Sequence, residues 1–393
     1  MLAALLAPFR TRPPEAKASR TASLVAFFAG GRPRWTPRDY ASLAREGFAR
    51  NAIAYRAVRL IGECAASLPL VLMDGRMEME THPLLDLMRR PNPRLTGSGL
   101  MEAICSHLLV AGNAYVEAVA LDGGIRELHV LRPDRVRVVP GPDGWPDAFE
   151  YTLSGSTVRI SQDTLVPGRD VPAILHLASF NPLDDHYGFA PLEAAGQALD
   201  LHNAASAWNK ALIDNAARPS GALVYGGSGS LSDEQFERLK GELEASFQGA
   251  VNAGRPLLLE GGLDWRPLSL SPKDMDFEAA RNAAAREIAL AIGVPPLLLG
   301  IPGDNTYANY AEANRALWRQ SVVPLVRRVC DALALWLGPA YGGDLSLLPD
   351  LDQVEALATE RTELWSRIGA ADFLTDTEKR VAVGYGEGGR MRR

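Results

Sequence analysis

The stretch PPLLLGIPGDNTYANYAEANRALWRQSVVPL, Pro295–Leu325, joins two patterns around which the rest of the chain can be organised. An apolar run with two prolines leads into a glycine-flanked loop, and a helical pattern begins abruptly after that loop. Such a loop is suited to cradle a phosphate, to hold a catalytic group, or to project into a cavity. The helix that follows, the composition and the chemistry of the chain distinguish these three alternatives.

The helical pattern carries apolar residues at spacings of three and four over residues 317–336, which predicts an amphipathic helix. Its start is predicted at Asn309, with Glu312 three residues later as in a capping box, or alternatively at Asn305 or Thr306. The polar and aromatic residues at this junction have two interpretations. One is helix capping and packing, and the other is a loop tip that contacts a ligand or a polymer.

Pro324 lies inside the same helical pattern. A proline in a helix has no N–H to donate, so the carbonyl of Gln320 loses its partner and the ring crowds the preceding turn. We therefore expect a kink at Pro324, which would set the direction in which the helix leaves the loop.

The composition is that of an ordinary globular protein. At 393 residues the chain is longer than proteins with a single hydrophobic core usually are, so two or more subdomains are expected. Hydrophobic residues make up 47% and the mean hydropathy is -0.06. Apolar runs of about 18 residues, which would span a membrane, do not occur, and MLAALLAPFR lacks the charged start of a secretory signal. Neither a membrane span nor a signal is therefore predicted.

Charge is distributed unevenly along the chain. Residues 1–59 contain eleven Lys or Arg against three Asp or Glu, a local charge of +8. Because the net charge of the whole chain is -6, residues 60–393 carry a charge of -14. A basic amino-terminal arm on an acidic body is a candidate contact for a polyanion or a partner, and the alternative is a solvated leader. The acidic body argues against tight binding of nucleic acid, because that affinity comes from Lys and Arg.

The motifs of nucleotide and metal chemistry are missing from the sequence. GGSGS at 226–230 lies between a predicted strand and a predicted helix, yet no GK[ST] follows it. The loop at 300–306 has no lysine, and its Asp304 would repel a phosphate. The three cysteines are far apart, and neither GxSxG nor HExxH occurs. We therefore predict no enzymatic activity, no cofactor and no metal, and the competing hypothesis is a hydrolase or nucleotide-binding enzyme that uses GGSGS.

The order of elements indicates an α+β fold. Helices and turn-bounded strands alternate up to about residue 182. Two Ala-rich helical segments, near 190–217 and 274–293, then flank a small α/β insertion at roughly 219–272. Because small residues let helices approach closely, this arrangement predicts a stalk that carries a tip. One more helical segment, LDQVEALATERTELWSRI, and a flexible GEGGRMRR end are predicted in the tail.

Several segments, taken in order, resemble one family, the portal proteins that form the head–tail connectors of tailed phages. The resemblance covers roughly residues 40–345. Within the family, the chain is most similar to the short portals of siphophages, prophages and gene transfer agents. The segments that carry it are HPLLDLMRRPNP, GNAYVEA, LRPDRVRVV, ILHLASFNPLDDHYGFAPLEAA, IALAIGVPPLLLGIP and NTYANYAEANRALWRQSVVPL.

The resemblance implies a dodecameric ring with wing, stem, clip and crown regions around a DNA channel. The regions implied are a basic, flexible arm (1–39), the first part of the wing (40–188), stem helix 1 (189–218), the clip (219–273), stem helix 2 (274–294), the tunnel loop region (295–310), a kinked wing helix (311–343), and a short crown with a flexible tail (344–393). The crown is shorter than in larger portals, which puts crown-dependent functions such as sensing of internal DNA in doubt.

The resemblance also implies partners and site residues. The ring would sit at the portal vertex of a virion or phage-like particle assembled in the bacterial cytoplasm, without a membrane. Its partners would be sequence-independent double-stranded DNA, the terminase large subunit, a head–tail adaptor and the major capsid protein. A non-channel structural protein that oligomerises through the same helices is the other alternative. The tunnel-loop residues that would line or support the channel are Asp304, Asn305, Thr306, Tyr307, Asn309 and Tyr310.

Overall fold

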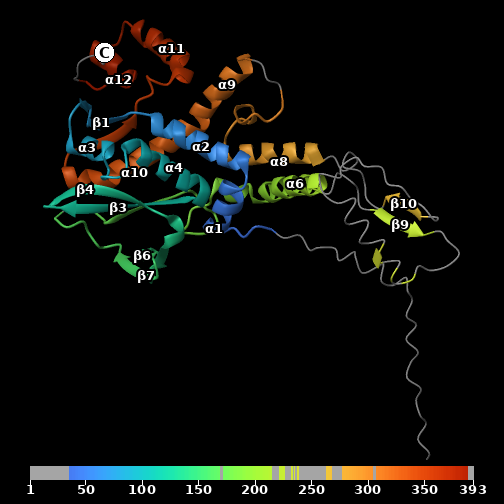
Figure 1. The fold of residues 1–393 in the computed structure, drawn as a ribbon. Coiled ribbons are helices and arrows are strands. Elements are labelled where there is room, and N and C mark those ends of the chain that lie inside the picture. The colour runs from blue at the N-terminus through green and yellow to red at the C-terminus, as the bar shows by residue number, and fades with distance from the viewer. Residues whose placement is uncertain are drawn as a thin grey trace, which may run out of the picture. The chain divides into compact units, whose positions relative to one another are not determined.

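The fold mixes helices with small antiparallel sheets, which confirms the predicted α+β class (Figure 1). The computed structural model describes residues 35–168, 171–214, 221–225, 232, 234, 237–238, 263–267, 277–303 and 307–387. Residues from Thr36 onward form one compact unit. Most of the arm predicted at 1–39 lies outside the described residues. Its end is fixed where the Thr36 N–H and hydroxyl donate to the Asp200 carboxylate at 2.8 and 2.5 Å.

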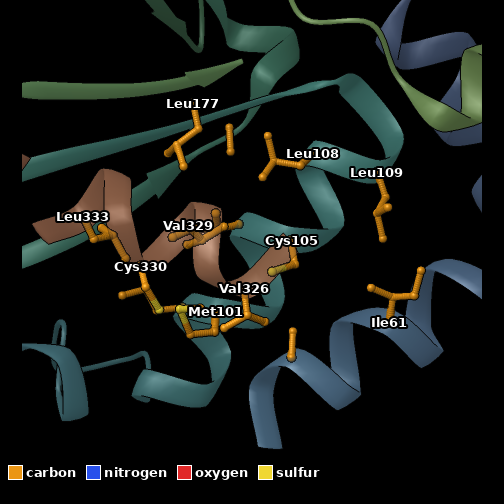
Figure 2. Close-up of a cluster of buried hydrophobic side chains, with 14 of the residues drawn as sticks. Ile61, Met101, Cys105, Leu108, Leu109, Leu177, Val326, Val329, Cys330 and Leu333 are labelled. Carbon is orange, nitrogen blue, oxygen red and sulfur yellow. The ribbon is translucent and has the colours of Figure 1, made fainter. Parts of the chain in front are cut away.

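Three helices meet at the centre of the hydrophobic core. They are α2 (Ala52–Ser67), α4 (Gly97–Ala111) and α10 (Val323–Tyr341). Figure 2 shows side chains from all three pointing into one cluster, among them Ile61, Cys105 and Val326, and each of these is at most 1% exposed. Cys330 of α10 joins them as a free thiol, as Cys105 is. The core therefore joins segments more than 200 residues apart in the sequence.

The ends of the core helices follow local capping chemistry. The Asn51 side-chain oxygen accepts from the N–H groups of Ile53 and Ala54, both at 3.1 Å, and starts α2 where the sequence predicts. Helix α4 ends at Gly112, which adopts φ 69°. A left-handed residue at this position is most easily a glycine, because a side chain would be strained there.

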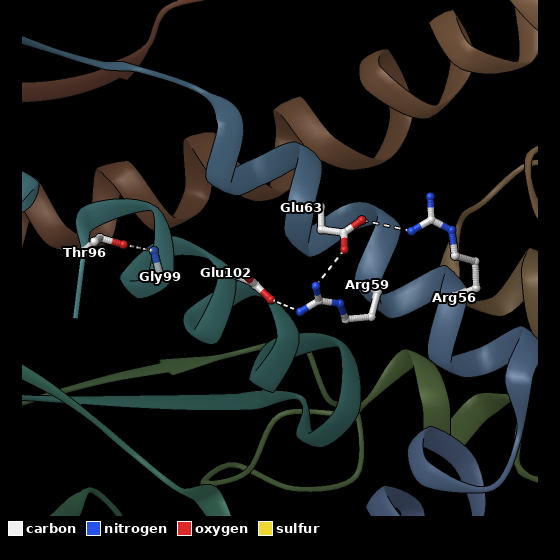
Figure 3. Close-up of polar contacts among 6 residues, drawn as sticks. All are labelled: Arg56, Arg59, Glu63, Thr96, Gly99 and Glu102. Atoms are coloured by element: carbon white, nitrogen blue, oxygen red, sulfur yellow. Dashed lines mark hydrogen bonds and ion pairs between the residues drawn. The ribbon is translucent and has the colours of Figure 1, made fainter. Parts of the chain in front are cut away.

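A ladder of ion pairs crosses from α2 to α4 (Figure 3). Glu63 bonds Arg56 at 2.9 Å and Arg59 at 2.7 Å, and Arg59 reaches Glu102 of α4. These side chains are between a third and a half exposed, so each pair contributes at most about 1 kcal/mol. The ladder therefore fixes the relative placement of the two helices more than it stabilises them.

One sheet joins an early segment of the chain to a late one. Its strand order is β11–β1–β2, with β1 at Leu70–Asp74, β2 at Met77–Met79 and β11 at Leu345–Pro349. Leu72 and Leu347 lie opposite each other and are fully buried. The strand β11 was not predicted, because residues 344–393 were all assigned to the crown and tail. That division of the chain remains a prediction, but residues 345–349 pair with β1, which lies in the region predicted as the wing.

Two further antiparallel sheets, ordered β4–β3–β8 and β5–β6–β7, share a second hydrophobic cluster. Tyr115 and Ile174 come from the first sheet and Phe149 from the other, and all three are buried. The ring of Tyr115 stacks on His176 at 4.4 Å between centroids. The strands are β3 (Asn113–Leu121), β4 (Gly124–Leu131), β5 (Val136–Pro140), β6 (Pro146–Leu153), β7 (Ser156–Ser161) and β8 (Ile174–Ala178).

The buried amide of Asn113 connects these parts. Its oxygen accepts from the Gly188 N–H at 2.8 Å and lies 2.9 Å from His176 Nε2. Its nitrogen donates to the carbonyls of Ala111, at 2.8 Å, and of Gly188. One side chain thus links the end of α4, two strands and the segment before the next helices.

Those next helices are α5 (Pro191–Ala194) and α6 (Gly196–Asp214), which pack along α8 (Phe277–Ile292). Buried small residues such as Ala205 and Ala284 lie on these helices, as the Ala-rich sequence indicates. The first stem segment divides at Ala195 rather than running as one helix. Of the predicted insertion, β9 (Gly221–Tyr225) and β10 (Leu263–Pro267) form an antiparallel pair, while GGSGS and most of the insertion lie outside the described residues.

The carboxy-terminal segment differs from the prediction in two ways. The predicted helix is α11 (Ala358–Gly369), but a further helix, α12 (Asp376–Ala382), follows it behind a Thr375–Glu378 capping box. The tail predicted to be flexible from residue 386 is bound at its start. The N–H of Glu387 donates to the Arg76 carbonyl at 2.7 Å, and the two side chains form an ion pair at 2.7 Å.

The remaining short elements connect the larger ones. They are α1 (Tyr40–Ser42), the π-helical segment η2 (Leu43–Ala49), α3 (Pro83–Arg89), and the 3-10 turns η3 (Pro133–Arg135), η5 (Pro296–Leu299) and η7 (Glu355–Leu357).

Gly112 offers a test of the core. A Cβ there would lie 2.4 Å from the Gly188 carbonyl oxygen, whereas at Gly75, with φ 56°, it would meet nothing within 4 Å. We expect Gly112→Ala to lower the free energy of unfolding by about 3 kcal/mol or more, since clash adds to strain. Gly75→Ala should cost about 1 kcal/mol. Denaturant titration measures both, and equal losses would contradict the close approach at Gly112.

Two buried histidines predict a loss of stability in acid. Burial lowers the pKa of both His107 and His176 from 6.5 to about 4. In the unfolded chain these two imidazoles therefore become protonated below pH 6.5, whereas in the folded chain they stay neutral until about pH 4. We expect each histidine to cost about 2 kcal/mol of stability between pH 7 and pH 5. Denaturant titrations at both pH values should show a smaller loss for His107→Asn than for the unchanged chain, and an equal loss would contradict the prediction.

Candidate functional site

The predicted loop residues are only partly described. Asp304, Asn305 and Thr306 lie outside the described residues, and Tyr307 is the first residue of helix α9 (Tyr307–Leu317). Asn309 and Tyr310 both lie in the first turn of α9 and are exposed, Tyr310 by 52%. Because α9 begins at Tyr307, Asn309 lies inside the helix and is not its cap, which corrects the first of the two predicted starts.

The segment before the loop folds back onto helix α8. Helix α8 ends at Gly293, which has φ 85°. The chain then passes through the 3-10 turn η5 to Ile301, whose side chain is 4% exposed and packs with Ala285 and Ala289 of α8. The Arg286 guanidinium also donates to the carbonyl of Pro302. The loop therefore leaves from a base that is held against α8.

The segment after the loop runs through α9, a π-helical turn and α10. The π-helical turn η6 (Trp318–Val322) is closed by the Val323 N–H, which donates to the Trp318 carbonyl five residues earlier. Pro324 follows as the second residue of α10, so the change in hydrogen bonding occurs just before the proline. The prediction that Pro324 sets the direction of this helix remains a prediction.

A carboxylate of the carboxy-terminal region contacts the same helix. Glu360 of α11 lies 3.3 Å from the Arg319 guanidinium and 3.8 Å from that of Arg315. Arg315 also bonds Glu312 at 2.9 Å. Each pair is partly exposed, so its energy is small, but together they connect the helix that follows the loop to the carboxy-terminal helices.

The chemistry of the described residues is sparse. Within them no three His, Cys, Asp or Glu side chains are grouped so that they could hold a metal ion. Burial raises the pKa of the Cys105 thiol to about 12, so this sulfur stays protonated at neutral pH. In the part of the chain that was searched, no helix is long and apolar enough to cross a membrane.

Sequence reasoning missed the residues that support the loop. Arg286 and Ser321 are polar residues inside helical patterns, and their partners are backbone carbonyls of distant segments. Only Gly293, at the end of the helical segment predicted near 274–293, gave a local signal. The partners of the other two depend on the tertiary fold.

Comparison with known proteins agrees with this arrangement. Residues 52–384 match the phage portal protein family. The probable portal protein of Streptomyces phage phiC31 is 29% identical over 79% of this chain and 69% of its own length. A chain in the neck of an empty gene transfer agent (GTA) particle, computed with C6 symmetry, is 56% identical over 93% of this chain and 99% of its own, with a TM-score of 0.70. The corresponding chain in a native GTA neck computed with C12 symmetry is 55% identical over the same shares, with a TM-score of 0.67.

A family match over most of the chain shows the class of protein. The chain belongs to the phage portal protein family, and its α+β fold is a portal fold.

Proposed function

We propose that twelve copies of this chain form a ring at one vertex of a phage-like particle, and that DNA enters and leaves through the ring. The observation that supports this best is the likeness, at 55% identity, to a chain of the GTA neck computed with C12 symmetry. At this identity over nearly the whole chain, subunit contacts are expected to be retained. The particle would be a gene transfer agent, a prophage or a related phage.

The stem helices of a single chain have apolar surface that a neighbour would cover. Trp208 and Leu201 of α6 are 43% and 49% exposed, and Leu290 of α8 is 80% exposed. In a closed ring each subunit presents two different faces, one to each neighbour. Side chains of this size are stabilised by burial at such a contact, by about 1.5 to 3 kcal/mol each when it is complete.

The loop region would face the channel. Asp304, Asn305 and Thr306 would form its tip, and Tyr307, Asn309 and Tyr310 would line or support the narrowest part. Tyr310 is half-exposed in the single chain, which leaves it accessible to a polymer. The acidic body suits a conduit, because strong phosphate contacts would hold DNA in place whereas weak ones let it slide. Binding would therefore be independent of DNA sequence.

The partners follow from the assignment of regions. The clip at 219–273 would receive the terminase large subunit during packaging and a head–tail adaptor afterwards. The wing would contact the major capsid protein. The sequence has a glycine-rich GGSGS without the lysine and hydroxyl of a phosphate loop, so we assign the energy of packaging to the terminase ATPase.

Imaging of the purified full chain tests the ring. We expect negative-stain images to show rings with a central hole, and mass measurement to give a multiple of the 42.4 kDa subunit near twelve. A chain that stays monomeric at all concentrations would contradict the proposal. Closed assemblies without a hole would instead indicate a structural protein that lacks a channel.

The variant Tyr307→Ala tests the loop. Because Tyr307 begins the helix that follows the loop, we expect rings to form normally, while particles contain severalfold less DNA. Trp145→Ala is the matched control, since Trp145 is 74% exposed in the β5–β6 turn and should leave DNA content unchanged. DNA per particle, measured by quantitative amplification, decides the outcome. Normal DNA content in Tyr307→Ala particles would remove this residue from the channel.

A further inference from the structure

We propose that Arg286 and Ser321 are positioning residues that hold to α8 the two flanks of the loop at 304–306, namely residues 301–303 before it and helix α9 with its π-helical turn after it. The proposal rests on the proposed channel role of this loop. Arg286 bonds the carbonyl of Pro302, just before the loop, and Ser321, in the turn after α9, bonds the carbonyl of Gly293 at the end of α8.

The first flank is held by Arg286. This residue lies on α8, and its Nη2 donates to the carbonyl of Pro302. A Cβ at Gly303 would lie 3.1 Å from the same Nη2, so the backbone passes close to the guanidinium. Ile301 packs beside it on Ala285 and Ala289. A charged donor forms a stronger hydrogen bond than a neutral one. Arg286 therefore adds a strong polar contact, with a fixed geometry, to a contact that is otherwise apolar.

The second flank is held by Ser321. Its hydroxyl donates to the carbonyl of Gly293 at 2.5 Å and satisfies an acceptor at the end of α8. Gly293 adopts φ 85°, and a Cβ there would lie 2.8 Å from the Ser321 Oγ. Two independent constraints thus require glycine at 293. The close approach fixes the turn after α9 directly onto the end of the stem helix.

The π-helical turn aims Ser321 at this carbonyl. A π turn inserts one residue into the helix, which changes the phase of the residues beside it by about 100°. Trp318 and Val322 are 8% and 0% exposed, so the core fixes the turn on its buried side. Ser321, next to Val322, is left on the side that meets α8. Pro324, which has no N–H, follows at once and disfavours return to a regular α-helix through this turn.

Both flanks are therefore attached to the same helix within two turns, at Arg286 and at Gly293. A displacement of α8 would carry residues 301–303 and the turn after α9 with it. In a ring, where α8 also meets a neighbour, the loop would follow the stem and not the wing sheets.

Hydrogen exchange in the assembled ring tests the supports directly. We expect Ser321→Ala to speed exchange of amides in 307–317, and Arg286→Gln that of amides in 300–303, each by about fivefold, the effect of one net hydrogen bond. Ser321→Thr, which keeps the hydroxyl, should restore the original rates. The matched controls are Ser67→Ala, whose hydroxyl bonds the Cys64 carbonyl, and Arg137→Gln, whose partner is Glu150. They should leave both flanks unchanged.

The outcomes separate this proposal from the channel role. Unchanged exchange in both variants, or loss of ring assembly in both, would overturn the positioning role. Faster exchange with an unchanged amount of DNA per particle would uphold the supports and remove the loop from the channel. Faster exchange with less packaged DNA, rescued by Ser321→Thr, would support both.

Discussion

The buried amide of Asn113 joins the end of α4, strands β3 and β8 and the segment before α5, and the remaining structure depends on this junction. It is 6% exposed and bonds the Ala111 carbonyl, His176 and both backbone groups of Gly188. A buried amide that lost these partners would cost stability, so the four contacts form together. Gly188 leads directly into Pro191 and the helices α5 and α6. The direction in which these helices leave the core is therefore set by the close approach of Gly112 to Gly188 and by one side chain.

Much of the fold could be predicted because its signals are local. Asn51 starts a helix and Gly112 and Gly293 end helices, since capping groups act on backbone atoms within a turn. Strand alternation and turn glycines similarly located β3 to β8. The helix after the loop was predicted from its apolar spacing, and Tyr310 is exposed in the first turn of α9. The role of the loop residues stays a prediction. These features need no knowledge of which distant segments meet.

The remainder depends on distant contacts that leave no local pattern. The pairing of Leu72 with Leu347 joins strands about 275 residues apart, and β11 alone is a short run that reads equally well as loop. The bond between Arg76 and Glu387 likewise binds a tail whose composition indicates flexibility. The π turn at 318–322 is another case, because the sequence shows a proline but not how the helix before it adapts.

The helices farthest along the chain bury few side chains, and contacts with neighbouring copies in a ring would add to their packing. Helices α11 and α12 contain no buried residue, and helices this short are marginal on their own. Polar contacts hold them instead: the Arg361 Nε donates to Asp352 at 2.6 Å, and the Tyr385 hydroxyl donates to the same carboxylate at 2.5 Å. Such contacts fix geometry while contributing little burial. An element that is placed but not covered is suited to meet a neighbouring copy, so in a portal ring its stability would depend on assembly.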